Sequence, residues 1–506
     1  MKTFLGIDIG TSSVKIIAIN ETLDLIGESS YPYPTDYPKP FWSEQDPELW
    51  WQATKIALNQ LLSLHKILPE TIAAIGLTGQ MHSLVAIDHH NQIIRNAILW
   101  NDQRSSFETK YINEIAGGQN KLIDLVANRS ITGFTLSKLL WLKHNESANF
   151  AQIHKILLPK DEIRRRLTND YATDVSDASG TLMFDVKNRK WSNEILELFK
   201  INPKILPHVY ESAQITGYVS QLARNELGLN INCPVVAGAG DCIAAAIGLG
   251  VVDDGILAIS LGTSGILMAS TSNPLIDYSG RLHSFCHGIE HKWHIMGVNL
   301  TGGGSLKWFK EALYPDDDKF YDAIDHNIKD INPGSSGLFF LPYLNGERTP
   351  HFNANAHGAY IGLTLKHNKG HFLRALMEGV AYNLRQTLEI MKEIPIPISQ
   401  IRVTGGGLKN QLWLNILSDI LGYNLIKLKS DQGPAIGAAL LAGQGSNYFN
   451  NIEDNATRLA KSIETVQVNE TNHQFYQHSY RIFQDLYKAL ENPYNEIANL
   501  YNNTNY

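Results

Sequence analysis

Ile7-Asp8-Ile9-Gly10-Thr11-Ser12 is a hexapeptide that returns in altered form as Ile259-Ser260-Leu261-Gly262-Thr263-Ser264. Each copy ends one apolar run and precedes another, which predicts two hairpins with glycine in the turn. Glycine lets the backbone approach an anion closely, and the following amides and hydroxyls supply hydrogen-bond donors. A single Gly-Thr-Ser is more often an ordinary turn, but the repeat predicts two phosphate loops, of which only the first carries a carboxylate.

Length and composition fit two similar halves that enclose a nucleotide cleft. A chain of 506 residues is too long for one core, and we place the boundary near residues 248–254, giving domains 1–248 and 249–506. The net charge of −7, with both signs interspersed, argues against nucleic acid as a partner. We expect no membrane span, because the most apolar late stretch, 234–252, contains Asp241. Three cysteines without metal-ligand spacing and a start without an export signal predict a reduced, cytoplasmic protein.

Apolar periodicity predicts an α/β chain with mixed sheets. In the first half we expect strands at 3–9, 14–20, 25–31 and 72–77, and a helix at 47–64 capped by Asp46. In the second half we expect strands at 255–260, 265–269, 338–341 and 401–404, and helices at 305–313, 370–392, after Asn410 and after Pro434.

An apolar strand followed by a glycine turn delivers a carboxylate at Val235-Val236-Ala237-Gly238-Ala239-Gly240-Asp241. Asp241 and Asp8 suit phosphoryl transfer, one as the base for an attacking hydroxyl and the other as an anchor for Mg²⁺. A glycosidase pair would leave the phosphate loops unexplained, whereas a hydrolase, with water replacing the alcohol, stays open. In the purely structural alternative, Asp241 only caps a helix that begins at Cys242.

Two further glycine clusters lie in the second half. Val403-Thr404-Gly405-Gly406-Gly407 ends a strand before a helix at Asn410, which suits a nucleotide resting on bare backbone, although a tight turn explains it equally. The segment 431–439 starts a helix with small residues, which we interpret as close packing beneath that nucleotide site. The segment 299–305 is also rich in glycine and is a flexible turn in the simplest interpretation.

The chain resembles the FGGY family of carbohydrate kinases over residues 1–445, and more faintly to 490. Six ordered motifs carry the resemblance: Trp42-Ser43-Glu44-Gln45-Asp46-Pro47, Gly79-Gln80-Met81-His82, Ile98-Leu99-Trp100-Asn101-Asp102, Leu157-Leu158-Pro159-Lys160-Asp161, Asp174-Val175-Ser176-Asp177-Ala178-Ser179-Gly180 and Leu341-Pro342-Tyr343-Leu344-Asn345-Gly346-Glu347-Arg348-Thr349-Pro350. The resemblance implies two actin-like ATPase (ribonuclease H-like) domains flanking a central cleft. It also implies ATP and Mg²⁺ as cofactors, a ketopentose, D-xylulose, as substrate, and a homodimer.

The resemblance also assigns roles to individual residues. Asp241 becomes the base for the terminal hydroxyl of the sugar, and Asp8 orders Mg²⁺ and the phosphates. The substrate contacts are Met81, His82, Trp100, Asn101, Asp102 and Cys242, and the nucleotide contacts are Gly10, Thr11, Ser12, Lys15, Gly262, Thr263, Gly406, Gly407 and Asn410. From the residues alone, His82 and Trp100 fit a packed interior equally well, and Lys15 fits a solvated strand.

One departure from the family pattern concerns the acceptor. The family members that act on xylulose usually have asparagine after the catalytic aspartate, whereas this chain has Cys242, a poorer hydrogen-bond partner. If that asparagine recognises a sugar hydroxyl, its loss shifts selectivity toward another ketose, a polyol or a sugar acid. The alternative from a different class is a non-catalytic, actin-like module that binds ATP.

Overall fold

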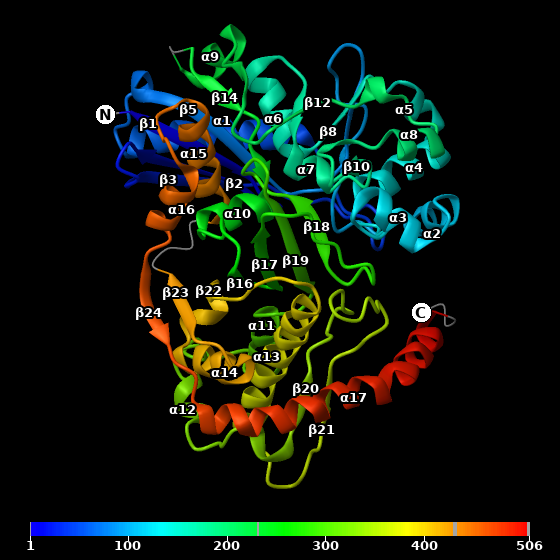
Figure 1. Cartoon of the computed structure of the whole chain (residues 1–506), viewed down its shortest axis with the longest axis vertical. Coiled ribbons are helices and arrows are strands. Elements are labelled where there is room, and N and C mark those ends of the chain that lie inside the picture. The colour runs from blue at the N-terminus through cyan, green and yellow to red at the C-terminus, as the bar shows by residue number, and fades with distance from the viewer. Residues whose placement is uncertain (1, 230–231, 429–432, 503–506) are drawn as a thin grey trace. The chain divides into compact units, whose positions relative to one another are not determined.

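The computed structural model of the protein describes residues 2–229, 232–428 and 433–502. Strands and helices alternate along the chain, which confirms the predicted α/β class (Figure 1). Contacts divide the chain into two compact units of three segments each. Unit 1 comprises Met1–Asp253, Ser270–His294 and Gln432–Ala460, and unit 2 comprises Asp254–Ala269, Ile295–Asp431 and Lys461–Tyr506.

The large sheet of unit 1 has the order β13-β14-β5-β1-β2-β3, with β15 also pairing with β5. Its strands are β1 (Thr3–Ile9), β2 (Ser13–Asn20), β3 (Leu25–Pro32), β5 (Ile72–Gly79), β13 (Ile215–Tyr218), β14 (Pro234–Val236) and β15 (Ala239–Gly240). The first hairpin pairs β1 with β2 antiparallel, whereas β1 and β5 run parallel. Short two-stranded sheets use β4 (Glu44–Gln45) with β7 (Ala97–Ile98), β6 (Val85–Ile87) with β8 (Lys155–Leu157), β9 (Ala172–Asp174) with β12 (His208–Tyr210), and β10 (Phe184–Asp185) with β11 (Lys190–Trp191).

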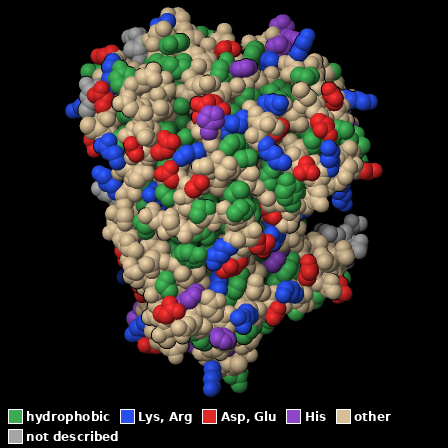
Figure 2. Space-filling view, in the orientation of Figure 1, with side chains coloured by type: hydrophobic (Ala, Val, Ile, Leu, Met, Phe, Trp, Pro, Cys, Tyr) green, Lys and Arg blue, Asp and Glu red, His purple; other side chains and the backbone are tan. Residues whose placement is uncertain are grey.

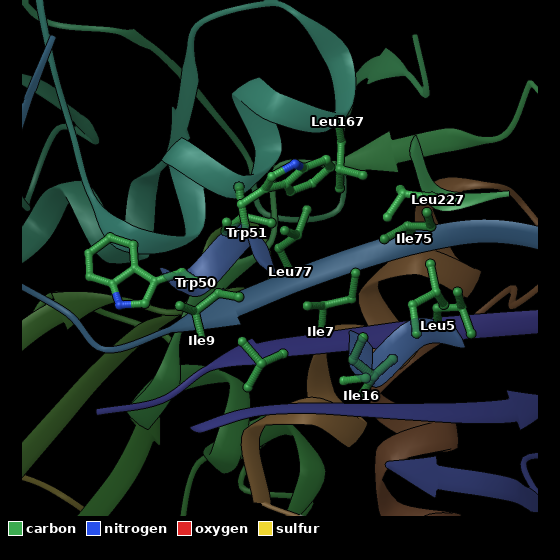
Figure 3. Close-up of a cluster of buried hydrophobic side chains, with 14 of the residues drawn as sticks. Leu5, Ile7, Ile9, Ile16, Trp50, Trp51, Ile75, Leu77, Leu167 and Leu227 are labelled. Carbon is green, nitrogen blue, oxygen red and sulfur yellow. The ribbon is translucent and has the colours of Figure 1, made fainter. Parts of the chain in front are cut away.

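The helices of unit 1 are α1 (Pro47–Leu64), α2 (Ser106–Ile115), α3 (Gln119–Val126), α4 (Thr135–Asn145), α5 (Ser147–Ala151), α6 (Pro159–Thr168), α7 (Val175–Ser179), α8 (Asn193–Leu198), α9 (Gln221–Leu227), α10 (Asp241–Gly248), α15 (Gly433–Gly445) and α16 (Ile452–Leu459). Among them, α1, α6, α10 and α15 pack on this sheet, whereas α2, α3, α4, α5 and α8 lie to its side (Figure 1). Asp46 caps α1 as predicted, because its side chain accepts the Glu48 N–H at 2.9 Å. Both faces of β1 are buried. On one face, Leu5, Ile7 and Ile9 form a core with Trp51 of α1 and Leu77 of β5 (Figure 3). Each fully buried Leu or Ile there contributes roughly 1.5–3 kcal/mol.

The helix α15 comes late in the sequence but belongs to unit 1, where it packs on β1 and β5 (Figure 1). A Cβ on Gly6 would lie 1.9 Å from the Ala435 oxygen, and one on Gly76 equally close to the Ala438 oxygen, so both strands need glycine there. The predicted close packing of this small-residue helix is confirmed, with strands of unit 1 as its partners, and its predicted place beneath the nucleotide site stays a prediction. Position 431, where that prediction begins, lies outside the described residues. Because Ser270–His294 and Gln432–Ala460 belong to unit 1, the compact units are not consecutive stretches of the chain.

The second large sheet has the order β18-β19-β17-β16-β22-β23-β24. Its strands are β16 (Ile256–Leu261), β17 (Gly265–Thr271), β18 (His283–Cys286), β19 (Trp293–Asn299), β22 (Gln400–Thr404), β23 (Leu425–Leu428) and β24 (Ser462–Val466), and β20 (Phe339–Leu341) pairs separately with β21 (Ala359–Ile361). The helices of unit 2 are α11 (Gly304–Leu313), α12 (Ile324–Ile328), α13 (Lys369–Glu393), α14 (Gln411–Leu421) and α17 (Glu470–Asn502). The second hairpin pairs β16 with β17, and β16 runs parallel to β22, which repeats the plan of β1, β2 and β5.

The surface carries both signs of charge. On the face that Figure 2 shows, Lys and Arg side chains are interspersed with Asp and Glu.

The three cysteines, Cys233, Cys242 and Cys286, all lie in the described ranges and are thiols rather than disulfides. Among the helices of the described ranges, none combines the length and the apolar character that crossing a membrane requires.

Candidate active site

Unit 1 gathers its candidate catalytic residues at the carboxyl end of β5. The strands β1 and β15 run parallel to β5 on its two sides, and Asp8 and Ala239 both lie opposite Thr78. Parallel strands end at the same edge of a sheet, so Asp8 and Asp241, which follows β15, meet at that edge. Residues 80–82 leave β5 at the same place. The topology thus explains how carboxylates far apart in sequence come together.

Both carboxyl groups titrate far above their ordinary range. Burial raises the pKa of Asp241 to about 6, against opposing hydrogen bonds from Cys242, whose backbone N–H donates at 2.7 Å. Burial, and then the charge of Asp241, raise the pKa of Asp8 to about 7, while Lys15 lowers it. Groups that titrate near neutral pH are suited to proton transfer. The helix α10 begins at Asp241, with Gly240 in the cap position, so Asp241 is not the N-cap that the structural alternative supposed.

Asp8 also fits a bound cation. Its Oδ1 atom is buried and has no hydrogen-bond partner among the described residues. A buried carboxylate oxygen without a donor is costly unless a cation completes the site. Within residues 2–229, 232–428 and 433–502, no cluster of three or more His, Cys, Asp and Glu is arranged to hold a metal ion. A single buried carboxylate oxygen such as Asp8 Oδ1 suits Mg²⁺, which keeps several waters and needs only one or two protein carboxylates.

The predicted first phosphate loop, residues 10–12, is held in place by hydrogen bonds from side chains of neighbouring segments. The Gly10 carbonyl accepts hydrogen bonds from the Tyr33 hydroxyl and from Gln80 Nε2, and the Thr11 carbonyl accepts one from Gln45 Nε2 at 2.7 Å. With these carbonyls engaged, Gly10 and Thr11 are partly exposed and Ser12 is exposed. Sequence reasoning noticed Gln45 and Gln80 only within family motifs and missed Tyr33, because a tyrosine in a proline-rich loop gives no local signal.

Lys15 lies beside the first carboxylate rather than in the turn itself. It is the cross-strand partner of Asp8 on β2, and its Nζ atom is 3.1 Å from Glu28 Oε2. About a third of the side chain is exposed. Its place fits electrostatic support of Asp8, and a direct phosphate contact by Lys15 stays a prediction.

The residues after β5 are packed into unit 1. Met81 is only 3% exposed and packs against Gly240. His82 has a left-handed φ of 71°, and its Nδ1 lies 2.8 Å from the Gly180 carbonyl oxygen. The imidazole also stacks edge-on against Phe134. Met81 is therefore part of the packed interior next to Gly240. His82 is partly exposed, so a ligand can reach it.

In the segment 100–102, Trp100 and Asn101 lie near the predicted site, whereas Asp102 has a structural role. Trp100 Nε1 donates to Thr11 Oγ1 at 3.0 Å, which joins the predicted sugar wall to the first phosphate loop. The Oδ1 atom of Asn101 is buried and lacks a hydrogen-bond partner among the described residues. Asp102 is fully buried, and its carboxylate accepts hydrogen bonds from the Ser43 N–H and from Arg104. The predicted sugar contact of Asp102 is therefore corrected to a structural ion pair, because its charge is compensated inside the protein.

Unit 2 contains a pocket of about 730 Å³ at the carboxyl ends of β16 and β22. It is lined by all five nucleotide residues predicted in this half, Gly262, Thr263, Gly406, Gly407 and Asn410. Its volume is that of a small-molecule site. The side chain of Asn410 is already engaged, because Oδ1 accepts the Trp413 N–H and Nδ2 donates to Asp325 Oδ1. The side chain of Asn410 thus caps α14 at the edge of the pocket. A contact of Asn410 with adenosine stays a prediction, and it would use backbone atoms of this residue.

Backbone packing makes the floor of this pocket. Gly405 has a φ of 108°, and a Cβ there would lie 2.5 Å from the Leu261 oxygen, so only glycine fits. The Gly303 N–H donates to the Gly262 carbonyl at 2.7 Å, which ties the glycine-rich segment 299–305 to the second phosphate loop. That segment is therefore a fixed part of the pocket rather than a flexible turn. Sequence reasoning missed further lining residues, Gly303, Gly304, Leu306, Lys307, Tyr321, Asp322, Ile324, Asp325, Lys409 and Gln411.

Comparison with known proteins agrees with this geometry. Models of the FGGY family of carbohydrate kinases match residues 3–248 (N-terminal domain) and 257–445 (C-terminal domain). A xylulose kinase of Bacillus subtilis (strain 168) is 38% identical over 477 residues, 94% of this chain and 95% of that protein. A gluconokinase of the same strain is 31% identical over 452 residues, 86% of each chain. A ligand-bound xylulose kinase from Lactobacillus acidophilus has a TM-score of 0.92 at 26% identity, covering 98% of this chain and 100% of that one, which confirms the actin-like two-domain fold.

Proposed function

This chain belongs to the FGGY family of carbohydrate kinases, and we propose that it transfers the γ-phosphoryl group of ATP to the terminal hydroxyl of D-xylulose, giving D-xylulose 5-phosphate. Kinases of this family use ATP as the phosphate donor. The observation that carries the proposal is the pair of carboxylates, Asp8 and Asp241, at the end of β5, with pKa values of about 7 and 6. The higher identity to a xylulose kinase than to a gluconokinase favours a ketopentose over a sugar acid.

Asp241 is the proposed base. It is partly exposed, so a substrate hydroxyl can reach it, and a pKa of about 6 leaves it ionised at pH 7.5. It lies in the first turn of α10, where the helix dipole favours the charged form. As the hydroxyl oxygen attacks the γ-phosphorus, Asp241 accepts the hydroxyl proton and ADP leaves with the bridging oxygen.

Asp8 is the proposed Mg²⁺ anchor. Its buried Oδ1 atom lacks a donor among the described residues, and its raised pKa shows that its charge is under-compensated by the protein alone. When bound, Mg²⁺ neutralises charge on the transferring phosphates. Lys15 supports the same carboxylate electrostatically.

The nucleotide is proposed to occupy the pocket of unit 2. Glycine backbone at Gly262, Gly406 and Gly407 allows close approach of a flat base, a ribose or phosphates. Thr263 adds a hydroxyl donor at the pocket wall. We propose that the loop at residues 10–12 of unit 1 also binds the phosphates. Its residues are partly or fully exposed.

The sugar is proposed to rest on Trp100 and to meet polar groups of Asn101, His82 and Cys242. The buried Oδ1 of Asn101 is an acceptor that a sugar hydroxyl satisfies. Cys242 is partly exposed next to the base, so the difference from the usual asparagine lies where the acceptor hydroxyls bind. We therefore expect D-xylulose to be used, with weaker discrimination between ketoses.

The test is ADP release coupled to an indicator enzyme, with ATP and Mg²⁺ and with D-xylulose, L-xylulose, ribulose, glycerol, gluconate or no sugar. D-Xylulose should give the highest kcat/KM, and Asp241→Asn should lower kcat by about 10²–10⁴-fold. Asp88→Asn is the matched control, because Asp88 is a carboxylate in an exposed turn that accepts backbone N–H groups of His90 and Gln92. A higher kcat/KM for another acceptor would replace D-xylulose, and ATP binding without turnover on any acceptor would favour a non-catalytic module.

A further inference from the structure

A fully buried charge cluster lies behind the base in unit 1. The ammonium of Lys160 is 2.6 Å from Asp161 Oδ1, 2.9 Å from Asp174 Oδ1 and 3.4 Å from Asp177 Oδ2. All four side chains are completely inaccessible to solvent. Charges buried in this way are costly, and breaking them by removing one partner costs more than their net contribution. None of these four groups has a part in the proposed chemistry, so the cluster must serve a different role.

Asp174 connects this cluster to the turn that carries the base. Its Oδ2 atom accepts hydrogen bonds from the hydroxyls of Ser176 and Ser212, the latter at 2.8 Å. The Ser176 hydroxyl in turn accepts the Gly240 N–H at 3.1 Å, and the Ser212 carbonyl accepts the Gly238 N–H at 2.9 Å. One carboxylate thus reaches two backbone groups of the glycine turn.

These two bonds act on the residues immediately before the base. Gly238 has a φ of 81°, and Gly240 directly precedes Asp241. Glycine has little conformational preference of its own, so the path of this turn depends on its surroundings, namely the pairing of β15 with β5 and the hydrogen bonds to Gly238 and Gly240. On the other side of the turn, the side chain of Met81 packs against Gly240.

Resting on the proposed function of Asp241 as the base, we propose that Asp174 is a positioning residue that acts through Ser176 and Ser212 to fix the turn 238–241 and so the direction of the Asp241 carboxylate. Lys160 supplies the positive charge that balances Asp174 in the interior. A displacement of about 1 Å at the base is enough to cost on the order of 10²-fold in rate, so the bonds to this turn bear directly on turnover.

The helix α7 provides a matched control. Ser176 and Ser179 are both fully buried serines of this helix, and each hydroxyl accepts one buried backbone N–H. Ser176 accepts that of Gly240 at 3.1 Å, whereas Ser179 accepts that of Cys286 at 3.0 Å on β18. Each substitution to alanine therefore removes the acceptor of one buried backbone N–H from the same helix, and only Ser176→Ala touches the turn before the base. The hydroxyls differ as donors, because Ser176 donates to the Asp174 carboxylate and Ser179 to the Val175 carbonyl.

The experiment compares Ser176→Ala with Ser179→Ala. We expect Ser176→Ala to lower kcat about tenfold or more, with the KM for ATP within twofold of the wild type. Ser179→Ala should lower Tm, because it leaves a buried backbone N–H unpaired, but it should keep kcat within twofold of the wild type. Ser212→Ala, which removes the other hydroxyl on Asp174, should lower kcat in the same direction. Equal losses of kcat in Ser176→Ala and Ser179→Ala would overturn the proposal.

Hydrogen–deuterium exchange gives a readout that does not need activity. Peptides that span residues 238–241 should exchange faster in Ser176→Ala than in the wild type, and at the wild-type rate in Ser179→Ala. Unchanged exchange at 238–241 in Ser176→Ala would contradict the proposal. If the wild type phosphorylates no sugar, the proposed function fails, while the exchange data still decide whether these bonds hold the turn. If Ser176→Ala does not fold, Ser212→Ala decides by the same two readouts.

Discussion

In unit 1, the penultimate residue of β1 is a carboxylate, Asp8, whereas the corresponding residue of β16 in unit 2 is Ser260. The surroundings of the two positions are alike, because each lies on a hairpin strand that runs parallel to an inner strand. Each is also opposite a threonine, Thr78 on β5 and Thr404 on β22. The repeated backbone plan is therefore independent of the charge that it presents.

The charge difference separates two kinds of chemistry. Burial raises the pKa of both Asp8 and Asp241 toward neutral, and the charge of Asp241 raises the pKa of Asp8 further, which suits proton transfer and a cation. Around Ser260, glycine backbone lines a pocket without a carboxylate on the repeated loop itself, which suits an anionic ligand. A carboxylate at both positions would repel the phosphates twice. The comparison teaches that the same strand plan serves both units and that one residue, Asp8 or Ser260, decides whether the hairpin presents a charge.

The largest effect is expected when Asp8 loses its charge. Asp8→Asn keeps the volume but removes the proposed Mg²⁺ ligand, and it should lower turnover at fixed Mg²⁺ by at least the roughly 10–100-fold that loss of an outer-shell partner costs a metal site. Part of the loss should be recovered when turnover is measured across an MgCl₂ titration. Ser260→Ala is the paired control in unit 2 and should stay within a few-fold of the wild type. A Mg²⁺ dependence unchanged in Asp8→Asn would remove Asp8 from the metal site.

The second comparison concerns packing at the residues two positions before Asp8 and Ser260. Gly6 on β1 lies beneath α15, with the Ala435 oxygen 1.9 Å from where a Cβ would lie, whereas the matching residue on β16 is the buried Ala258. Gly6→Ala should lower the free energy of unfolding by about 1–3 kcal/mol or more, because the helix backbone must shift. Ala258→Gly should cost only about 1 kcal/mol. Urea unfolding of both variants measures this, and equal losses would show that α15 tolerates a methyl group.

A smaller effect is expected when unit 2 receives the charge of unit 1. Ser260→Asp should raise the KM for ATP about tenfold, equivalent to about 1.4 kcal/mol, because the new carboxylate repels the phosphates. The value of kcat at saturating ATP and the KM for the sugar should stay near the wild type. Ser260→Asn, of the same size but neutral, is the control. A rise in the sugar KM instead of the ATP KM would place the sugar, not the nucleotide, beside β16.

The sequence was sufficient for the two hairpins and for several helices, because strong apolar periodicity and capping residues act locally. The helix 47–64 was predicted to the residue, and the hairpin strands to within one or two residues, whereas the helices between residues 106 and 227 were not predicted one by one. Gly406 and Gly407 of the unit 2 pocket were predicted because a run of glycines after a strand marks a place where the backbone lies bare, and their contact with a nucleotide stays a prediction. The place of α15 was not predictable, because its small residues indicate close packing without naming the partner.

Buried charge was the main source of error at the site. Asp102 follows a tryptophan and an asparagine in a pattern that suits a sugar, but its carboxylate is held by Arg104 and Ser43. A sequence shows that a carboxylate exists and not which donor compensates it. The same limit hid the role of Asp174, which stands in a family motif with Ser176 but whose partners Ser212 and Lys160 lie on separate segments.

The smallest expected effect concerns Lys15, which is the cross-strand partner of Asp8. The pKa of Asp8 is raised to about 7 mainly by burial, and the positive charge of Lys15 lowers it, so Lys15→Met should raise it further. Asp8 is then ionised only at higher pH, and the acid limb of the kcat/KM profile should move upward by roughly 0.2–0.7 of a pH unit, as for a partly exposed ion pair. Lys55→Met, which removes a partly exposed lysine paired with Glu226, should leave the limb in place. A loss of ATP affinity without a shift of the limb would instead show that Lys15 binds phosphate directly, and the asymmetry between the two hairpins would then extend to β2.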